Sequence, residues 1–357
     1  MVQKFRYPLL FTGMLALLAA LWGGLLRMGW QFPVVQPNWI AQHGVLMVAG
    51  FFGTLIHLER AVALGKGWAY VGVAINAIGA LLLTLHRFPI VGAFALVLGS
   101  LLLLLIFAAA LRAHLNEHTL VMAGGALSLA IGNILWVFGT SVYQLVLWWA
   151  AFLVLTIAGE RLEMTRMLNL GAPARRLFRA ALLLYALGLL GLFVDTNIGA
   201  RLNGIGSIAL AVWLLRNDIA RRTIRQTGIT RFIAICLLSG YVWLLIAGGL
   251  SLIYGIPAGG ASYDAMLHAI FLGFVFSMIF GHAPIIFPAV LGLQVVYTRW
   301  FYLPLGALHS ALLIRTLGDL TGNLPARQWG GLLNALIIVL YLGMLLLPTL
   351  AARLRNR

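Results

Sequence analysis

Four histidines lie in long apolar stretches of the chain. Burying an imidazole there costs free energy, so a function is expected of these residues. His43 and His57 bound the segment HGVLMVAGFFGTLIH, and His268 and His282 bound HAIFLGFVFSMIFGH. In a regular helix with 1.5 Å rise, fourteen residues separate the two histidines of each segment by about 21 Å and return them to roughly one face. Neutral imidazole is a good ligand for iron. The spacing therefore predicts two depths in a membrane at which imidazoles are available to a metal.

The two segments match each other at a fixed offset, which suggests how the histidines pair. His268 follows His43 by 225 residues, and His282 follows His57 by the same number. If the two helices face each other, His43 with His268 and His57 with His282 would each ligate one low-spin haem b through axial imidazoles. Copper or another metal, favoured less than haem, is one alternative; packing and a proton relay are the others.

Charged side chains near the histidines suggest how haem propionates would be held. Arg315 lies at the outer end of a predicted span and Arg60 near the inner histidines, and a guanidinium binds carboxylates through a bidentate fork. Both equally suit an anchor at a helix end. Asp264, four residues before His268, could orient the imidazole, receive a proton or serve as a helix N-terminal charge. His309, in another span, has three readings: a further ligand, a quinone contact or a core residue.

The composition indicates that membrane-spanning helices position these residues. Of 357 residues, 62% are hydrophobic and only 9% are charged, whereas soluble domains are about a quarter charged. Apolar runs of about 20 residues recur, each long enough to cross a ~30 Å hydrocarbon core. We therefore predict an all-α polytopic membrane protein surrounded by a lipid bilayer. Its twelve predicted spans cover residues 8–29, 40–62, 68–86, 90–111, 118–138, 143–163, 178–195, 199–216, 232–254, 264–287, 301–318 and 328–351.

The distribution of basic residues predicts the orientation. An even number of spans places both termini on one side, and with that side cytoplasmic, 19 of the 24 lysines and arginines fall inside and 5 outside. This is the bias that the positive-inside rule expects. It also accounts for the net charge of +16 without a nucleic-acid partner. We predict a bacterial-type inner (cytoplasmic) membrane and cytoplasmic termini.

An internal repeat suggests the domain organisation. The tripeptide GGL at 23–25 recurs at 248–250, at the same offset as the histidines, and LIHLER at 55–60 aligns more weakly with TIAGER at 156–161. Spans 2, 6 and 10 are thereby equivalent. We predict one transmembrane domain over 1–357, built from three four-helix units at about 1–114, 115–228 and 229–357.

These residues resemble two groups of known families. The paired H-x13-H is similar to the four-histidine signature of di-haem cytochromes b. Twelve spans with histidines on spans 2 and 10 resemble subunit I of haem-copper oxidases, which implies a low-spin haem on His43 and His268 with Arg315 at its propionates. Spans 6 and 7 contain no histidine, although that family's copper ligands lie there. An oxygen-reducing centre is therefore not supported.

The chain also resembles, in overall character, the NnrS family, which contains haem and copper and is linked to nitric oxide tolerance. The shared features are twelve spans, the H-[AG]-x-x-[LM] starts at 43 and 268, and the PAVLG that follows.

Together these features predict a b-type cytochrome with two bis-histidine haems, which would pass electrons between quinone and a redox protein at the outer surface. It would then be a quinol-linked oxidoreductase, although no catalytic residue is predicted. The alternatives are an NnrS-like haem or copper protein without transmembrane electron transfer, and a cofactor-free transporter.

Overall fold

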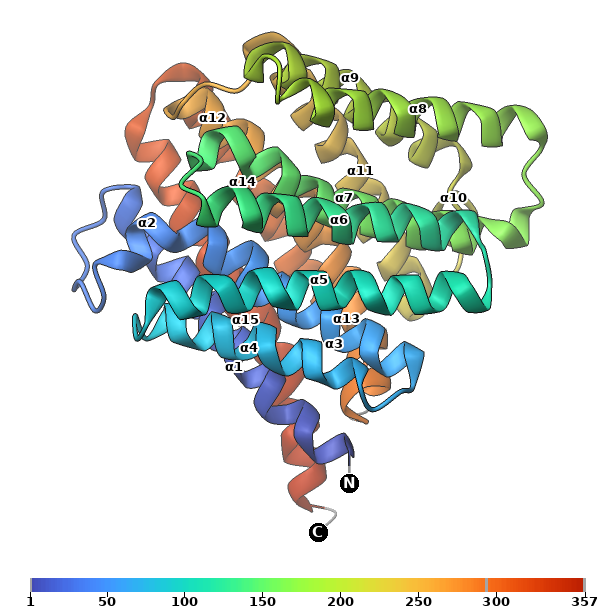
Figure 1. The fold of residues 1–357 in the computed structure, drawn as a ribbon, viewed down its shortest axis with the longest axis horizontal. Helices are drawn as coiled ribbons and strands as arrows, with labels where there is room; N and C mark the ends of the chain where they lie inside the picture. Colours follow the sequence, from blue (N-terminus) through green and yellow to red (C-terminus); the bar gives the residue numbers. More distant parts are fainter. Residues whose placement is uncertain (1, 293–294, 356–357) are drawn as a thin grey trace. The chain divides into compact units, whose positions relative to one another are not determined.

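Helices make up the regular secondary structure of the chain. The computed structural model describes residues 2–292 and 295–355, and no strand occurs in those ranges. Each of the twelve predicted spans coincides with a helix or an uninterrupted helical run (Figure 1). In chain order the elements are α1 (Val2–Arg27), α2 (Asn38–Val45), η1 (Leu46–Phe52), α3 (Gly53–Leu64), α4 (Ala69–Thr84), α5 (Pro89–Ala113), α6 (Glu117–Val137), α7 (Val142–Met164), η2 (Thr165–Leu168), α8 (Ala172–Gly191), α9 (Thr196–Asn217), α10 (Ala220–Thr223), α11 (Gly228–Tyr254), α12 (Ala261–His268), η3 (Ala269–Phe276), α13 (Ser277–Leu291), η4 (Arg299–Phe301), α14 (Tyr302–Thr321) and α15 (Leu324–Arg355).

The length and composition of these helices indicate an integral membrane protein. Within the described residues, 9 helices or helical runs are long and apolar enough to cross a membrane, and α4 is a shorter apolar helix. The other two predicted spans, which correspond to α8 and α14, carry arginines.

The two faces of α5 show why lipid is the expected surroundings. Its exposed side chains Ile90, Phe94, Leu98, Leu101 and Leu105 recur every three or four residues and form one apolar stripe. The opposite face is also apolar, and it is buried against α4 and α6. A helix that is apolar on its exposed face as well as its buried one is typical of a membrane span.

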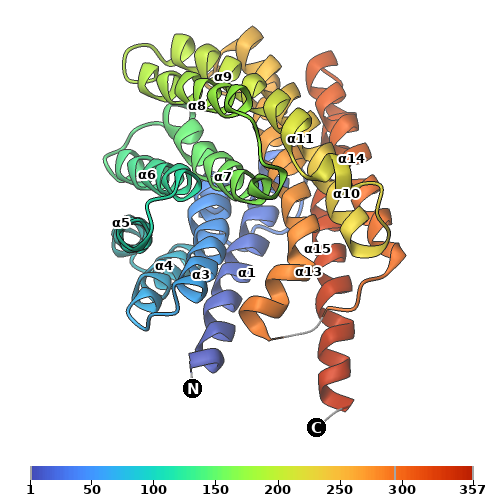
Figure 2. The ribbon, with the colours of Figure 1, turned by 90° about the vertical axis from the view of Figure 1, so that its right-hand side faces the viewer.

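The chain packs as two compact units. The first contains the described residues up to Gly159 together with Ala289–Gly292, and the second contains Glu160–Pro288 and the described residues after 294. In the first unit, α4 lies beside α1, α3 and α5 (Figure 2). In the second unit, α8 pairs with α9 and α14 pairs with α15, each through a short connection that makes the two helices antiparallel.

The helix ends follow from local sequence. Gly65 and Gly322 adopt left-handed backbone angles, φ +68° and +71°, and end α3 and α14. Glycine adopts this conformation without a side-chain penalty. Asp195 caps α9 because its Oδ1 accepts a hydrogen bond from the backbone N–H of Ile198 at 2.8 Å.

Candidate functional site

His43 lies on α2, and its ring is fixed by α1 of the same unit. Its Nδ1 is 2.6 Å from the backbone oxygen of Ala20. Because a carbonyl only accepts hydrogen bonds, Nδ1 carries the proton and donates it. Gly24 leaves room for the ring, since a Cβ at that position would lie 2.8 Å from the Cε1 of His43. In the neutral imidazole, Nε2 is then the nitrogen that carries the in-plane electron pair, which is the pair that binds a metal.

Both histidine-bearing helices become π-helical between their two histidines. η1 follows His43 after two residues, and η3 begins directly after His268. A π-helix makes i→i+5 hydrogen bonds, is rare, and is frequently found at functional sites. The predicted 21 Å separation and shared face assumed a regular α-helix between the histidines, and these segments depart from that geometry. In the first unit the two rings do not share one facing partner, because His43 contacts α1 whereas His57 contacts α4.

His57 lies on α3 and is only 1% exposed. Its Nε2 has no hydrogen-bond partner among the described residues. A buried nitrogen without a partner costs about 1–3 kcal/mol, so it is a candidate ligand. The ring is nevertheless enclosed within the first unit. A Cβ added to Gly72 of α4 would lie 2.6 Å from Nε2 and 2.8 Å from the Cβ of Leu102.

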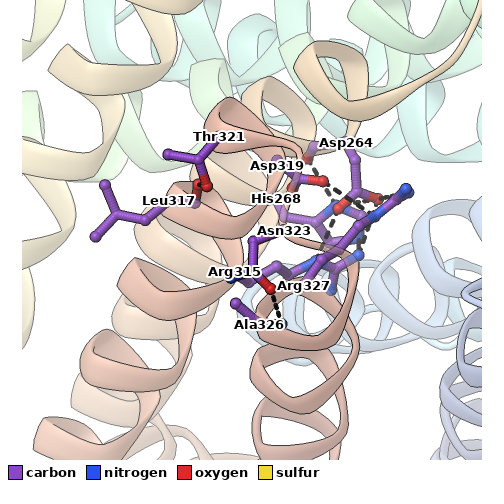
Figure 3. Close-up of polar contacts among 9 residues, drawn as sticks. All are labelled: Asp264, His268, Arg315, Leu317, Asp319, Thr321, Asn323, Ala326 and Arg327. Atoms are coloured by element: carbon purple, nitrogen blue, oxygen red, sulfur yellow. Dashed lines mark hydrogen bonds and ion pairs between the residues drawn. The ribbon is translucent and has the colours of Figure 1, made fainter.

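His268, at the end of α12, lies in an ionic environment (Figure 3). Its Nδ1 is 2.9 Å from the backbone oxygen of Asp264 and 3.3 Å from Oδ1 of the same residue. Its Nε2 is 3.2 Å from a terminal nitrogen of Arg315. Since a guanidinium only donates, Nε2 accepts this bond and Nδ1 carries the ring proton. The geometry thus assigns the same tautomer to His268 as to His43.

A network of charged groups extends from His268 over α12, α14 and α15, and we call it the Asp264 network. Arg315 binds Asp264 through a bidentate fork, with Nε–Oδ2 at 2.8 Å and NH2–Oδ1 at 2.9 Å. Arg327 lies 3.6 Å from Asp264 and 3.0 Å from Asp319. Arg315, predicted to meet a propionate, therefore already pairs with a carboxylate of its own chain.

Sequence reasoning missed Asp319 and the pairing of Arg327 with it. The available signal was a carboxylate close to Arg315 at the end of an apolar helix, where an unpaired charge is costly.

His282, on α13, has the same hydrogen-bond pattern as His43 and His268. Its Nδ1 lies 2.7 Å from the backbone oxygen of Met278, one turn earlier on the same helix. Three of the four candidate ligands thus have Nδ1 fixed by a backbone carbonyl. Metal-binding histidines almost always donate the other ring N–H to such an acceptor.

His309 lies on α14 and is held by hydrogen bonds at both ring nitrogens. The indole Nε1 of Trp243 donates to its Nδ1 at 2.9 Å, so the ring proton must be on Nε2. Nε2 lies 2.9 Å from the Oγ of Ser239 and 3.1 Å from the Oγ of Ser277. Of the three readings of His309, this geometry favours a core residue.

In the first unit, Asn76 of α4 bonds to groups on the first histidine-bearing helix, as His309 does to Ser277 on the second. Sequence reasoning did not find this residue. Its Nδ2 donates to the backbone oxygen of Ala49, within η1, and to the Oγ1 of Thr54, each at 3.0 Å. Thr54 in turn donates to the backbone oxygen of Gly50 at 2.6 Å. The amide therefore supports the π-helical segment from a neighbouring helix.

Arg60 pairs with its neighbour Glu59 at 2.9 Å and lies 3.5 Å from the Sδ of Met122. As with Arg315, the guanidinium predicted to hold a propionate is engaged within its own unit. A propionate at either position would have to share or replace these partners.

The glycines of the two GGL tripeptides have different surroundings. A Cβ on Gly23 would clash with the backbone oxygen of Trp39, so this glycine permits the close approach of α1 and α2. The matching Gly248 packs against Gly204 of α9, whereas a Cβ added to Gly249, which matches Gly24, would meet no neighbouring atom within 4 Å. The repeat in the sequence is thus not a repeat of the contacts made around the first histidine.

These residues fit haem ligation unequally. Within the described part of the chain, no group of three or more His, Cys, Asp or Glu side chains could hold a metal ion, but an axial haem site needs one imidazole on each face. The Nδ1–carbonyl bonds of His43, His268 and His282 suit that role. His57 has the free nitrogen but is enclosed by α4 and α5.

A family model described as a domain of unknown function, DUF8744, matches residues 6–350, almost the whole chain. No curated protein matches the sequence, and no solved structure does. The comparisons therefore place the chain in a family without assigning an activity.

Proposed function

We propose, for a chain that belongs to the DUF8744 family, that it is a membrane-embedded b-type cytochrome. His43 and His268 would ligate an outer haem, and His57 and His282 an inner haem. The pairing rests on the 225-residue repeat in the sequence. We further propose twelve spans in three four-helix units, with both termini in the cytoplasm of a bacterial-type inner membrane.

One observation carries the proposal. In the described helices, His43, His268 and His282 each donate Nδ1–H to a backbone carbonyl, so the in-plane electron pair of each ring is on Nε2. In His268 this nitrogen accepts a hydrogen bond from Arg315, which iron would have to replace. This is the arrangement that orients an imidazole for iron. The π-helical segment beside His43 and the one beside His268 add support, because such segments are frequent at functional sites.

A bound haem would supply one-electron chemistry, and the chain would tune it through ligation, burial and nearby charge. The surroundings of the two outer ligands differ in charge. His43 meets a neutral carbonyl, whereas His268 meets Asp264 and Arg315. We propose quinone and an outer-surface redox protein as the electron partners, which would make the protein a quinol-linked oxidoreductase.

The Asp264 network favours a second candidate, a cofactor-free transporter. Asp264, Arg315, Asp319 and Arg327 lie close together on helices of a membrane protein. Ionisable groups at such positions often line ion pathways.

Absorbance spectroscopy of the purified protein separates the two candidates. A cytochrome gives a red preparation with a reduced b-type α-band and about two haems per chain by the pyridine haemochrome assay. A quinol analogue would reduce these haems. A colourless preparation from haem-supplemented cells, with solute or proton uptake by proteoliposomes, would overturn the cytochrome and support the transporter.

Single substitutions then test the ligands. His43→Ala should remove the outer haem and leave the inner one, while His57→Ala should do the reverse. His114→Ala is the matched control, because this histidine is exposed beyond the end of α5. Loss of both haems from either ligand variant, with the protein still folded by circular dichroism, would contradict separate sites.

A further inference from the structure

A group of arginines lies at one end of the α8–α9 hairpin in the second unit. α8 begins and α9 ends there, and the Nε1 of Trp213 donates to the backbone oxygen of Ala174 at 2.7 Å. α10 follows and contacts both α9 and α11 (Figure 1). All the arginines of this group are exposed. We call the group the arginine surface; it comprises Arg175, Arg176, Arg179, Arg216, Arg221, Arg222, Arg225 and Arg231.

The carboxylate nearest to this surface in sequence is buried and already satisfied. Asp218 is 1% exposed. Its two oxygens accept from Arg161 at 2.7 and 3.0 Å, from the hydroxyl of Tyr241 at 3.0 Å and from the backbone N–H of Ala220 at 2.7 Å. The one other acid between 175 and 231, Asp195, caps the opposite end of α9. Asp218 therefore stabilises the helices beneath the arginine surface, and it does not neutralise the positive charge of the exposed arginines.

The exposed face of α8 changes from basic to apolar along one helix. Arg175, Arg176 and Arg179 are followed by exposed Leu183, Leu187 and Leu190. At 1.5 Å rise, Leu183 lies about 6 Å beyond Arg179. This is the order of chemistry met on passing from a lipid headgroup into its acyl chains, and arginine side chains at such a boundary extend toward the headgroups.

We propose that the arginine surface binds the phosphates of anionic phospholipids of the phosphatidylglycerol type. Guanidinium groups of α8 and α10 hold the headgroup phosphate through charge-assisted hydrogen bonds. The acyl chains lie along the exposed leucines of α8. An acidic protein would use the arginines alone, whereas a lipid also accounts for the leucines that continue the same face. The proposal is independent of haem binding.

Native mass spectrometry of the full-length protein tests this directly. The protein is released from nanodiscs that contain equal amounts of palmitoyl-oleoyl phosphatidylglycerol and phosphatidylcholine, and the retained lipids are counted. The test variant combines Arg175→Gln, Arg176→Gln and Arg222→Gln. The matched control combines Arg27→Gln, Arg87→Gln and Arg201→Gln, three exposed arginines outside the surface. It changes the net charge by the same amount.

The wild-type protein and the control should retain phosphatidylglycerol preferentially. In the test variant, the preference for phosphatidylglycerol over phosphatidylcholine should fall at least about tenfold. The reason is that each basic residue near an anionic surface contributes to the attraction. Equal retention by the test variant and the wild type would overturn the proposal, as would an equal loss in the control. Retained secondary structure by circular dichroism excludes unfolding as the cause of a loss.

Discussion

The two histidine-bearing helices share a plan and differ in what surrounds it. The run Asn38–Leu64 belongs to the first unit, and the run that begins at Ala261 belongs to the second as far as Pro288. Each carries two histidines fourteen residues apart, with a π-helical segment between them. In both, a hydroxyl within two residues of the end of that segment meets a polar side chain from a neighbouring helix. The pair is Thr54 with Asn76 in the first unit, and Ser277 with His309 in the second.

The difference between them is electrostatic. His43 meets the neutral carbonyl of Ala20, whereas His268 lies beside the Asp264–Arg315 fork. The side chain that contacts the hydroxyl also differs: it is the amide of Asn76 in the first unit and the imidazole of His309 in the second. The comparison shows that a sequence repeat can preserve the positions of the histidines while the helices packed around them differ in the charge they present.

Breaking the Asp264 network should have the largest effect. Asp264→Ala leaves Arg315 buried without its fork, and an uncompensated buried charge costs about 3–5 kcal/mol in the free energy of unfolding. Denaturant titration in detergent micelles measures this loss. The double variant Asp264→Leu with Arg315→Met should recover much of it, because no charge remains unpaired. A double variant less stable than Asp264→Ala would contradict this account.

The second-largest effect is expected from Gly24 and Gly249, which occupy the same position of the repeat but have different surroundings. Gly24→Ala places a Cβ 2.8 Å from the Cε1 of His43, so the ring must shift, at a cost of about 1–3 kcal/mol. Gly249→Ala, at the same repeat position, meets nothing within 4 Å and should gain up to about 1 kcal/mol from helix propensity. Thermal unfolding measures both changes. Equal behaviour of the two variants would remove this distinction between the repeats.

Asn76 should matter specifically to the first π-helical segment. Asn76→Leu leaves the backbone oxygen of Ala49 without this donor and should cost about 1–3 kcal/mol. Hydrogen exchange should accelerate in residues 46–54. Asn133→Leu is the control, because Asn133 is a buried amide of the same unit that bonds Leu96 and Trp149 instead. Acceleration in 46–54 by both variants would show a general loosening rather than local support.

Much of the helical plan could be predicted from the sequence, and the detailed contacts could not. All twelve predicted spans coincide with helices because apolar runs of that length have few other stable forms. Hydropathy carries no information on hydrogen-bond register, so the π-helical segments were not foreseen. Nor were the partners of Arg315 and Arg60, since a sequence shows that a charge is present without showing which carboxylate it meets.

Removing the Trp243–His309 hydrogen bond should change the free energy of unfolding least. It also tests most directly what fixes the imidazole that contacts the second histidine-bearing helix. Trp243→Phe removes the donor to Nδ1 and should cost about 0.5–1.5 kcal/mol. With that donor gone, the imidazole can move its proton to Nδ1 and accept from Ser277 at Nε2 instead. A double-mutant cycle with His309→Gln isolates the interaction, because only contacting residues give non-additive free energies of unfolding. Strict additivity would mean that the indole does not set the tautomer, and His309 would then lose its equivalence to the fixed amide of Asn76.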